Sequence, residues 1–198
     1  MRREGLGVRR ALGLGLLAYA LPLIVHAADV EAGRTKSAVC AACHGADGNA
    51  ALPGVPSLAA QPALHTFLQL VQFRAKRRAD PQMAVFAEKL SDGDMRDMAA
   101  YFAAQKSKPA EYKADEAKAA LGKQALEANY CGSCHMPDLS GQNQMPRLAG
   151  QNYDYLVKQL RGLKAGTRRD IDGSMASAAQ VLSEQDIDNI SQYLAAMK

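Results

Sequence analysis

Two short segments of the chain bring cysteine and histidine together at the same spacing. They are Cys40-Ala-Ala-Cys43-His44 and Cys131-Gly-Ser-Cys134-His135. In the Cys-x-x-Cys-His pattern, which is the attachment site of a c-type haem, two thiols add across the haem vinyl groups and the imidazole becomes an axial iron ligand. Since the two motifs use all 4 cysteines of the chain, the sequence predicts two covalently bound haem c groups.

Two other uses of four cysteines are possible. An exported protein could pair them in two disulfides, and a four-cysteine zinc site is formally possible. The duplicated motif argues against disulfides, and a zinc site would leave the paired histidines unexplained.

The amino terminus has the pattern of a secretory signal. Four arginines precede an apolar stretch over 11–25, which is short for a membrane span, and Val25-His26-Ala27 resembles a cleavage site. We therefore predict a signal peptide over 1–27 and a periplasmic protein, with an uncleaved anchor as the alternative. Removing 1–27 lowers the formal charge from +4 to +1, so the basic balance is no argument for nucleic acid or membrane binding.

The remaining chain contains an internal repeat. Cys40 matches Cys131 at an offset of 91, and Pro56-Ser57-Leu58-Ala59 matches Pro146-Arg147-Leu148-Ala149 at an offset of 90. Leu90-Ser91-Asp92 matches Leu182-Ser183-Glu184 at an offset of 92. We expect two domains, over 28–108 and 109–198, joined near the polar segment 106–110.

Both halves show helical patterns and no convincing strand pattern. Helices are predicted over 30–39 and 115–129 before the motifs, over 63–76 and 153–163 in the middle, and from Ser91 and Ser183 at the end. Ser91-x-x-Asp94 and Ser183-x-x-Asp186 are patterns of helix N-caps. The fold class is therefore all-α.

The second axial iron ligand follows by elimination. His26 leaves with the leader and His65, which corresponds to Tyr155, cannot serve two haems, so it is expected to pack or lie at the surface. Met83 lies 39 residues after His44, and Met175 lies 40 residues after His135. These methionines are predicted to ligate iron, although a loop methionine could also fill a packing gap.

Coordination by histidine and methionine favours ferrous iron and leaves no open position on the metal. A haem ligated in this way suits single-electron transfer better than catalysis at iron. The pattern predicts an electron carrier that is not an enzyme.

The chain resembles the dihaem cytochromes c, specifically the cytochrome c4 family. The resemblance covers the whole mature chain and depends on the double motif, the proline-containing segments 56–61 and 146–151, and the methionine and Leu-Ser blocks. It implies two tandem class I cytochrome c domains related by a pseudo-twofold axis. It also implies a periplasmic carrier, at most peripherally attached to the membrane, that passes electrons from a donor such as a quinol-oxidising complex towards a terminal oxidase such as the cbb3 type.

The resemblance further suggests residues that act on the haem indirectly. The carbonyls of Pro56 and Pro146 would accept the Nδ1–H of the histidine ligands, unless these prolines only shape the loop. Arg78 and Arg168 could pair with haem propionates or could be solvated charge. Met136 departs from the family pattern, because glycine is common at its position.

A rival class of function is an enzyme or its electron-accepting subunit, such as a dihaem peroxidase or a complex that oxidises thiosulfate or sulfide. The chain is short for such a peroxidase and has no spare histidine for a second ligand of that type. A haem protein that never changes its redox state is a third possibility, which a redox titration would expose.

Overall fold

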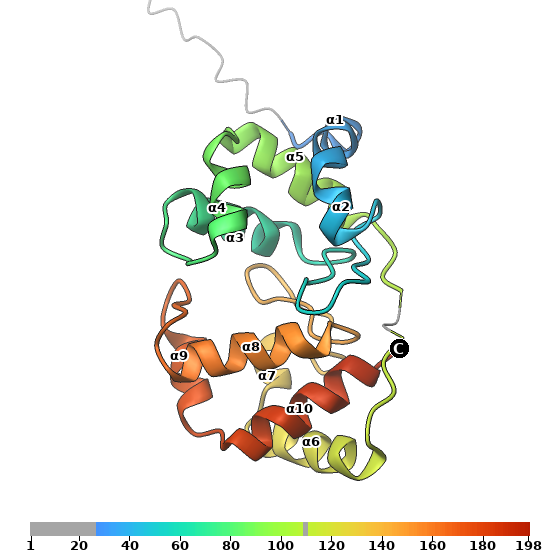
Figure 1. Cartoon of the computed structure of the whole chain (residues 1–198), viewed down its shortest axis with the longest axis vertical. Coiled ribbons are helices and arrows are strands. Elements are labelled where there is room, and N and C mark those ends of the chain that lie inside the picture. Colours follow the sequence, from blue (N-terminus) through green and yellow to red (C-terminus); the bar gives the residue numbers. More distant parts are fainter. Residues whose placement is uncertain (1–26, 109–110) are drawn as a thin grey trace, which may run out of the picture.

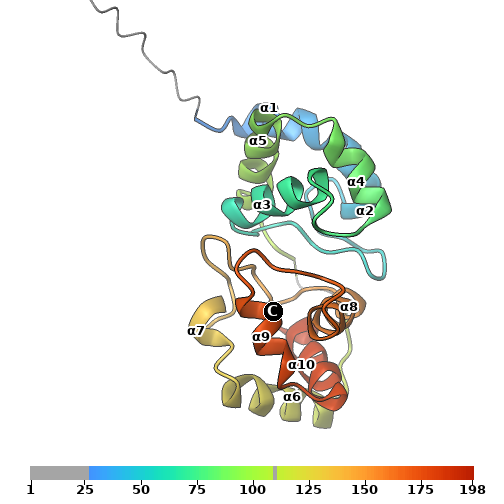
Figure 2. The same cartoon turned by 90° about the vertical axis from the view of Figure 1, so that its left-hand side faces the viewer.

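The computed structural model describes residues 27–108 and 111–198. These residues form two helical halves, one above the other along the long axis of the molecule (Figures 1 and 2). Within the two ranges there is no β-strand, and the one β-like feature is an isolated bridge between Gln142 and Met145. The all-α prediction is confirmed. Apart from Ala27, the predicted leader lies outside the described residues, as do Pro109 and Ala110 in the predicted join.

Apart from a 3-10 helix in the first half, the two halves repeat one order of elements. In the first half the helices are α1 (Val30–Lys36), the 3-10 helix η1 (Ser37–Cys40), α2 (Ala41–His44), α3 (Ala63–Arg74), α4 (Pro81–Glu88) and α5 (Asp92–Ala103). In the second half they are α6 (Glu116–Ala128), α7 (Gly132–His135), α8 (Tyr153–Lys164), α9 (Ser174–Gln180) and α10 (Glu184–Ala196). None of these helices combines the length and apolar character needed to cross a bilayer.

The first and last helices of each half pack against each other, α1 on α5 and α6 on α10. A glycine makes each contact possible. A Cβ added to Gly33 would lie 2.0 Å from the carbonyl oxygen of Asp97, and one added to Gly122 would lie 2.0 Å from that of Asn189. Because these neighbours are backbone atoms, the two helices can approach this closely only where the side chain is absent.

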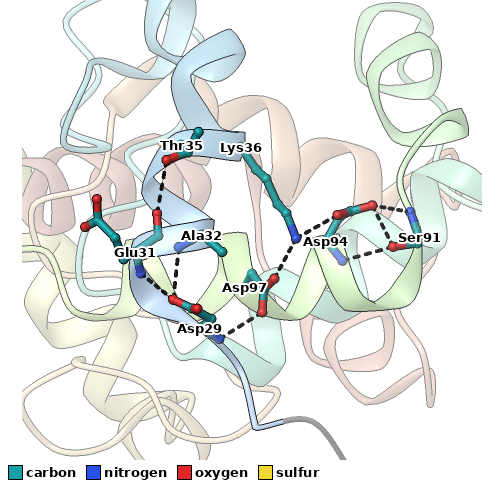
Figure 3. Close-up of polar contacts among 8 residues, drawn as sticks. All are labelled: Asp29, Glu31, Ala32, Thr35, Lys36, Ser91, Asp94 and Asp97. Atoms are coloured by element: carbon teal, nitrogen blue, oxygen red, sulfur yellow. Dashed lines mark hydrogen bonds and ion pairs between the residues drawn. The ribbon is translucent and has the colours of Figure 1, made fainter.

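Polar contacts hold α1 on α5 at the surface of the first half (Figure 3). The Lys36 ammonium lies 2.8 Å from Asp94 and 2.6 Å from Asp97, and the Asp29 N–H donates to Asp97 over 2.9 Å. Hydrogen bonds to Asp94 and Asp97 raise the pKa of Lys36 to about 12, and the bond from Lys36 lowers the pKa of Asp94 to about 2. These charges therefore favour the folded state at neutral pH, modestly because solvent reaches them.

The predicted starts of the last helices are confirmed. Ser91 caps α5 and Ser183 caps α10, and each forms a complete capping box with the aspartate three residues later. The apolar residues that follow are buried and form the core of each half: Met95, Met98, Phe102, Ile187, Ile190 and Leu194. Met95 and Met98 correspond to Ile187 and Ile190 in the repeat, and all four side chains are buried.

Two helices were not expected from the sequence. Met83 and Met175 lie in α4 and α9, in segments for which no helix was predicted. The Asp80 side chain accepts the N–H of Met83, and proline at the first position of α4 has a backbone angle suited to a helix start. In α9 the Asp170 side chain accepts the N–H of Met175 over 2.7 Å. The predicted helix over 30–39 also differs, since α1 ends at Lys36 and η1 completes the approach to Cys40.

The repeat extends to backbone conformations that favour glycine. Gly45 and Met136 follow the two motif histidines and have φ of 78° and 71° with ψ of 153° in both. Ala60 and Gly150 form a second such pair, with φ of 56° and 67°. In each pair one half has glycine and the other half has a residue with a side chain, so the backbone path is shared where the sequence is not.

Candidate haem-binding sites

Each motif histidine is buried at the end of a short helix and is oriented by a proline carbonyl. The Nδ1–H of His44 donates to the Pro56 carbonyl oxygen over 2.9 Å, and that of His135 donates to the Pro146 carbonyl oxygen over the same distance. Because a carbonyl can only accept, Nδ1 holds the proton and the Nε2 lone pair is free for a metal. Burial lowers the pKa of both imidazoles, which further favours the neutral ring.

No disulfide joins any two of the four motif cysteines. Cys43 and Cys134 are exposed, whereas Cys40 and Cys131 are partly buried, which raises the pKa of the Cys40 thiol to about 11 and raises that of Cys131. Among the described residues no three histidine, cysteine or acidic side chains form a cluster that could hold a metal ion. Because the cysteines are not paired in disulfides, each motif keeps two sulfurs for thioether bonds.

The predicted methionine ligands lie on helices separate from the histidines. In the upper half of Figure 1, α4 is on the left and α2 on the right at similar height, and in the lower half α9 is on the left and α7 lies nearer the centre. Met83 and Met175 are both half-buried, and Met175 packs against the core of its half. Each half thus places the predicted nitrogen ligand and the predicted sulfur ligand on two different elements.

Arg78 is buried at the boundary between the two halves, with 8% of its surface exposed. Its guanidinium donates to Gln69 over 2.5 Å within its own half, and to Tyr155 over 2.9 Å and Gln159 over 3.1 Å in the other half. It also lies 4.6 Å from the ring centre of Phe73. These partners are neutral, and Arg78 forms no ion pair with a carboxylate among the described residues.

Arg168, its counterpart in the second half, has a buried Nε with no hydrogen-bond partner. Burial lowers its pKa to about 10, and the nearby charge of Arg78 acts in the same direction. A haem would bring two propionate carboxylates, which are the groups that these arginines lack. The residues present therefore fit the predicted cofactor, whereas the adjoining Arg77 and Arg169 are exposed and match the alternative of solvated charge.

Some of the exposed apolar side chains lie on or next to the helices that carry Met83 and Met175. Val85 and Phe86 follow Met83 in α4 and have 62% and 48% of their surface exposed, and Val181 follows α9 with 73% exposed. A large apolar ring seated against these helices would remove such surface from water, at roughly 25 cal/mol for each Å² covered. These exposed apolar side chains, like the buried arginines, fit a haem in each half.

Three residues at the boundary between the halves had no assigned function in the sequence. The ring of His65 donates from Nδ1 to the Gln144 carbonyl over 2.9 Å, and burial lowers its pKa to about 4. The side chains of Gln61 and Gln151 cross to the opposite half. The sequence does contain a sign that the two glutamines are equivalent, because both end the repeated segment Pro-x-Leu-Ala-x-Gln, at 56–61 and 146–151.

In each half, the first of two helices that cross at a glycine leads into a Cys-x-x-Cys-His motif. This arrangement, present twice in one chain, defines a c-type cytochrome with two haems. Family models agree with this class, since "Cytochrome c" matches residues 119–198 and "Cytochrome C oxidase, cbb3-type, subunit III" matches residues 28–102. Cytochrome c4 of Pseudomonas aeruginosa is 40% identical over 90% of this chain and 94% of its own. The chain belongs to the cytochrome c4 family.

A solved structure supports the same assignment. Reduced recombinant cytochrome c4 from Pseudomonas stutzeri superposes with a TM-score of 0.81 at 34% identity, over 87% of this chain and all 100% of that one. The resemblance stated from the motifs is thus confirmed, together with the tandem cytochrome c fold and the two covalently bound haem c groups. The protein is a dihaem electron carrier of this family.

A relative with a different description is also similar. A thiosulfate dehydrogenase electron acceptor of Stutzerimonas stutzeri is 33% identical over 91% of this chain and 92% of its own. Proteins of this architecture therefore include one whose description names a particular enzyme as its electron donor.

Proposed function

We propose that the chain carries single electrons through two haems that are each ligated by histidine and methionine. One haem would be attached through Cys40 and Cys43 with His44 and Met83 as ligands, and the other through Cys131 and Cys134 with His135 and Met175. The observation that carries the proposal is the repeated geometry of each half, in which a proline carbonyl fixes the histidine Nδ1–H and a separate capped helix presents the methionine. The bound haem supplies the one-electron chemistry of its iron.

The side chains around each haem determine whether its iron transfers electrons or binds a substrate. Two side-chain ligands leave no position for a substrate, and thioether sulfur favours the reduced metal. Arg78 and Arg168 would balance the propionate charges from the boundary between the halves. These features support a carrier that accepts and releases electrons without binding a substrate at iron.

The proposed compartment is the periplasm, because 1–27 has the features of a leader and covalent haem attachment requires an exported chain with reduced thiols. Membrane association would be peripheral at most. The proposed route runs from a quinol-oxidising complex or another donor to a terminal oxidase such as the cbb3 type, as the family resemblance implies.

A second candidate function is to accept electrons from a sulfur-oxidising enzyme. The similarity to a thiosulfate dehydrogenase electron acceptor supports it. Stopped-flow mixing separates the two candidates: the reduced protein is mixed with a cbb3-type oxidase, and the oxidised protein with thiosulfate dehydrogenase plus thiosulfate. Fast turnover with the oxidase alone would support the first route, and fast reduction by the dehydrogenase would support the second.

The ligand assignment is tested by Met83→Ala and Met175→Ala in the ferric holoprotein. Each variant should lose about half of the sulfur-to-iron charge-transfer absorption, because one thioether ligand of two has been removed. Met197→Ala is the matched control, since this methionine packs against the core of the second half and should leave the band intact. Full two-haem intensity in Met175→Ala would show that the assignment is wrong.

A further inference from the structure

Two buried glutamines make the same contact in opposite directions between the halves. The Gln61 amide donates to the Arg147 carbonyl over 2.9 Å and accepts the Arg147 N–H over 3.0 Å. The Gln151 amide donates to the Ser57 carbonyl over 2.9 Å and accepts the Ser57 N–H over 2.8 Å. Both side chains are almost completely buried, with 5% and 4% of their surface exposed.

The backbone groups that these glutamines bind lie directly beside the histidine contacts. The Ser57 N–H and the Pro56 carbonyl belong to one peptide unit, and that carbonyl accepts the Nδ1–H of His44. The Arg147 N–H and the Pro146 carbonyl are related in the same way, and that carbonyl accepts the Nδ1–H of His135. A continuous chain of hydrogen bonds therefore runs from each glutamine, through one peptide, to the histidine of the opposite half.

Hydrogen bonds in such a chain strengthen one another. A peptide whose N–H donates to an acceptor has a more negative carbonyl oxygen, which then accepts more strongly; condensed-phase estimates put the gain at perhaps 10–30% for each bond. A stronger acceptor at Nδ1–H raises the basicity of the ring as a metal ligand. A more basic imidazole stabilises the oxidised metal, which lowers the reduction potential.

We propose that the two glutamines are crossed positioning residues, each setting the histidine–proline hydrogen bond, and so the reduction potential, of the haem in the opposite half. Gln151 acts on the His44 site and Gln61 acts on the His135 site. The inference rests on the proposed ligation by histidine, and it gives the interface a role beyond joining the halves. It also gives each haem a dependence on the correct docking of the other half.

The test is a redox titration of the holoprotein followed by NMR, so that the signals of each haem report its own potential. In Gln151→Leu the potential of the His44 haem should rise while that of the His135 haem stays in place, and Gln61→Leu should give the reverse. In the reduced state the His Nδ1–H resonance should move upfield only in the half opposite the substitution, and exchange of the Ser57 or Arg147 amide proton should accelerate.

Each variant is the matched control of the other, because both remove one equivalent contact from the interface. Equal shifts of both potentials in both variants, a shift only in the substituted half, or no shift would each overturn the proposal. An interface that merely loosens would give the first of these patterns.

A second substitution keeps the test decisive if a leucine variant fails to bind haem. Gln151→Glu retains an acceptor oxygen for the Ser57 N–H and should leave the His44 Nδ1–H resonance in place or move it downfield, opposite to leucine. An upfield shift in this variant would overturn the proposal. The charge-transfer test reports the sulfur ligand of each haem, whereas the crossed pattern compares the two halves of one variant with the unsubstituted protein, so failure of the first test and failure of the second are separate results.

Discussion

The crossing of α1 and α5 predicts a large effect from one methyl group. In Gly33→Ala the new Cβ would lie 2.0 Å from the Asp97 carbonyl oxygen and 2.6 Å from its carbon. Overpacking of this kind costs roughly 1–3 kcal/mol, and the upper end applies because helix backbone cannot rotate away as a side chain can. Alanine returns about 1 kcal/mol of helix propensity, so the net loss is about 2 kcal/mol.

Thermal unfolding of the holoprotein, followed by circular dichroism, measures this loss. For a half of this size, each kcal/mol lowers the unfolding temperature by about 4–8 °C, so about 8–16 °C is expected for the first half. Hydrogen exchange should place the weakened amides in α1 and α5.

Gly93→Ala is the matched control, since Gly93 lies on α5 of the same half and its nearest neighbour to an added Cβ is the Ser91 hydroxyl at 3.7 Å. This substitution should be neutral or stabilising by up to about 1 kcal/mol. If the two variants unfold at the same temperature, the close contact of α1 and α5 at Gly33 does not contribute to the stability of the first half.

Two further predictions concern backbone strain and pH. Met136→Gly should stabilise the second half by about 1 kcal/mol, because the backbone conformation at this position costs a residue with a side chain about 1–3 kcal/mol, while glycine loses about 0.5–1 kcal/mol more entropy on folding. Gly45→Ala should destabilise the first half for the same reason. Melting temperatures of the two variants that change in the same direction would contradict this. Lys36→Met should lower stability to urea at pH 7 but much less at low pH. The folded pKa of Asp94 lies at about 2, below its ordinary value, so the stabilisation is present above about pH 4 and is lost as the pH falls towards 2. A difference between Lys36→Met and the unsubstituted protein that is independent of pH would refute the assignment of this stability to the contacts with Asp94 and Asp97.

The sequence was most informative where local patterns determine local structure. The capping boxes at Ser91 and Ser183 predicted two helix starts, because the residues that satisfy the first backbone N–H groups are close in sequence. The double motif predicted two haems and the repeat predicted two halves. Helices α4 and α9 were missed because they are short, and short helices depend more on tertiary packing than on an apolar period.

Long-range contacts explain the rest of what sequence reasoning could not reach. Whether Arg78 was buried or solvated depended on Tyr155 and Gln159, which are 77 and 81 residues away. Gln61 and Gln151 bind backbone atoms, so no partner side chain reveals their contacts. The two glutamines can be matched in the repeat, but only the docked halves show what they touch.

The glutamine contact also bears on how a tandem protein of this kind can arise. It is isologous, since each half gives the same side chain to the same backbone position of the other, which is the geometry of a twofold dimer. Its target is main chain, so it is indifferent to serine at 57 and arginine at 147. Two separate copies of a single-haem ancestor could therefore have associated through this contact before any gene fusion. Fusion would then have fixed a pre-existing dimer in one chain, after which each half was free to diverge in its side chains.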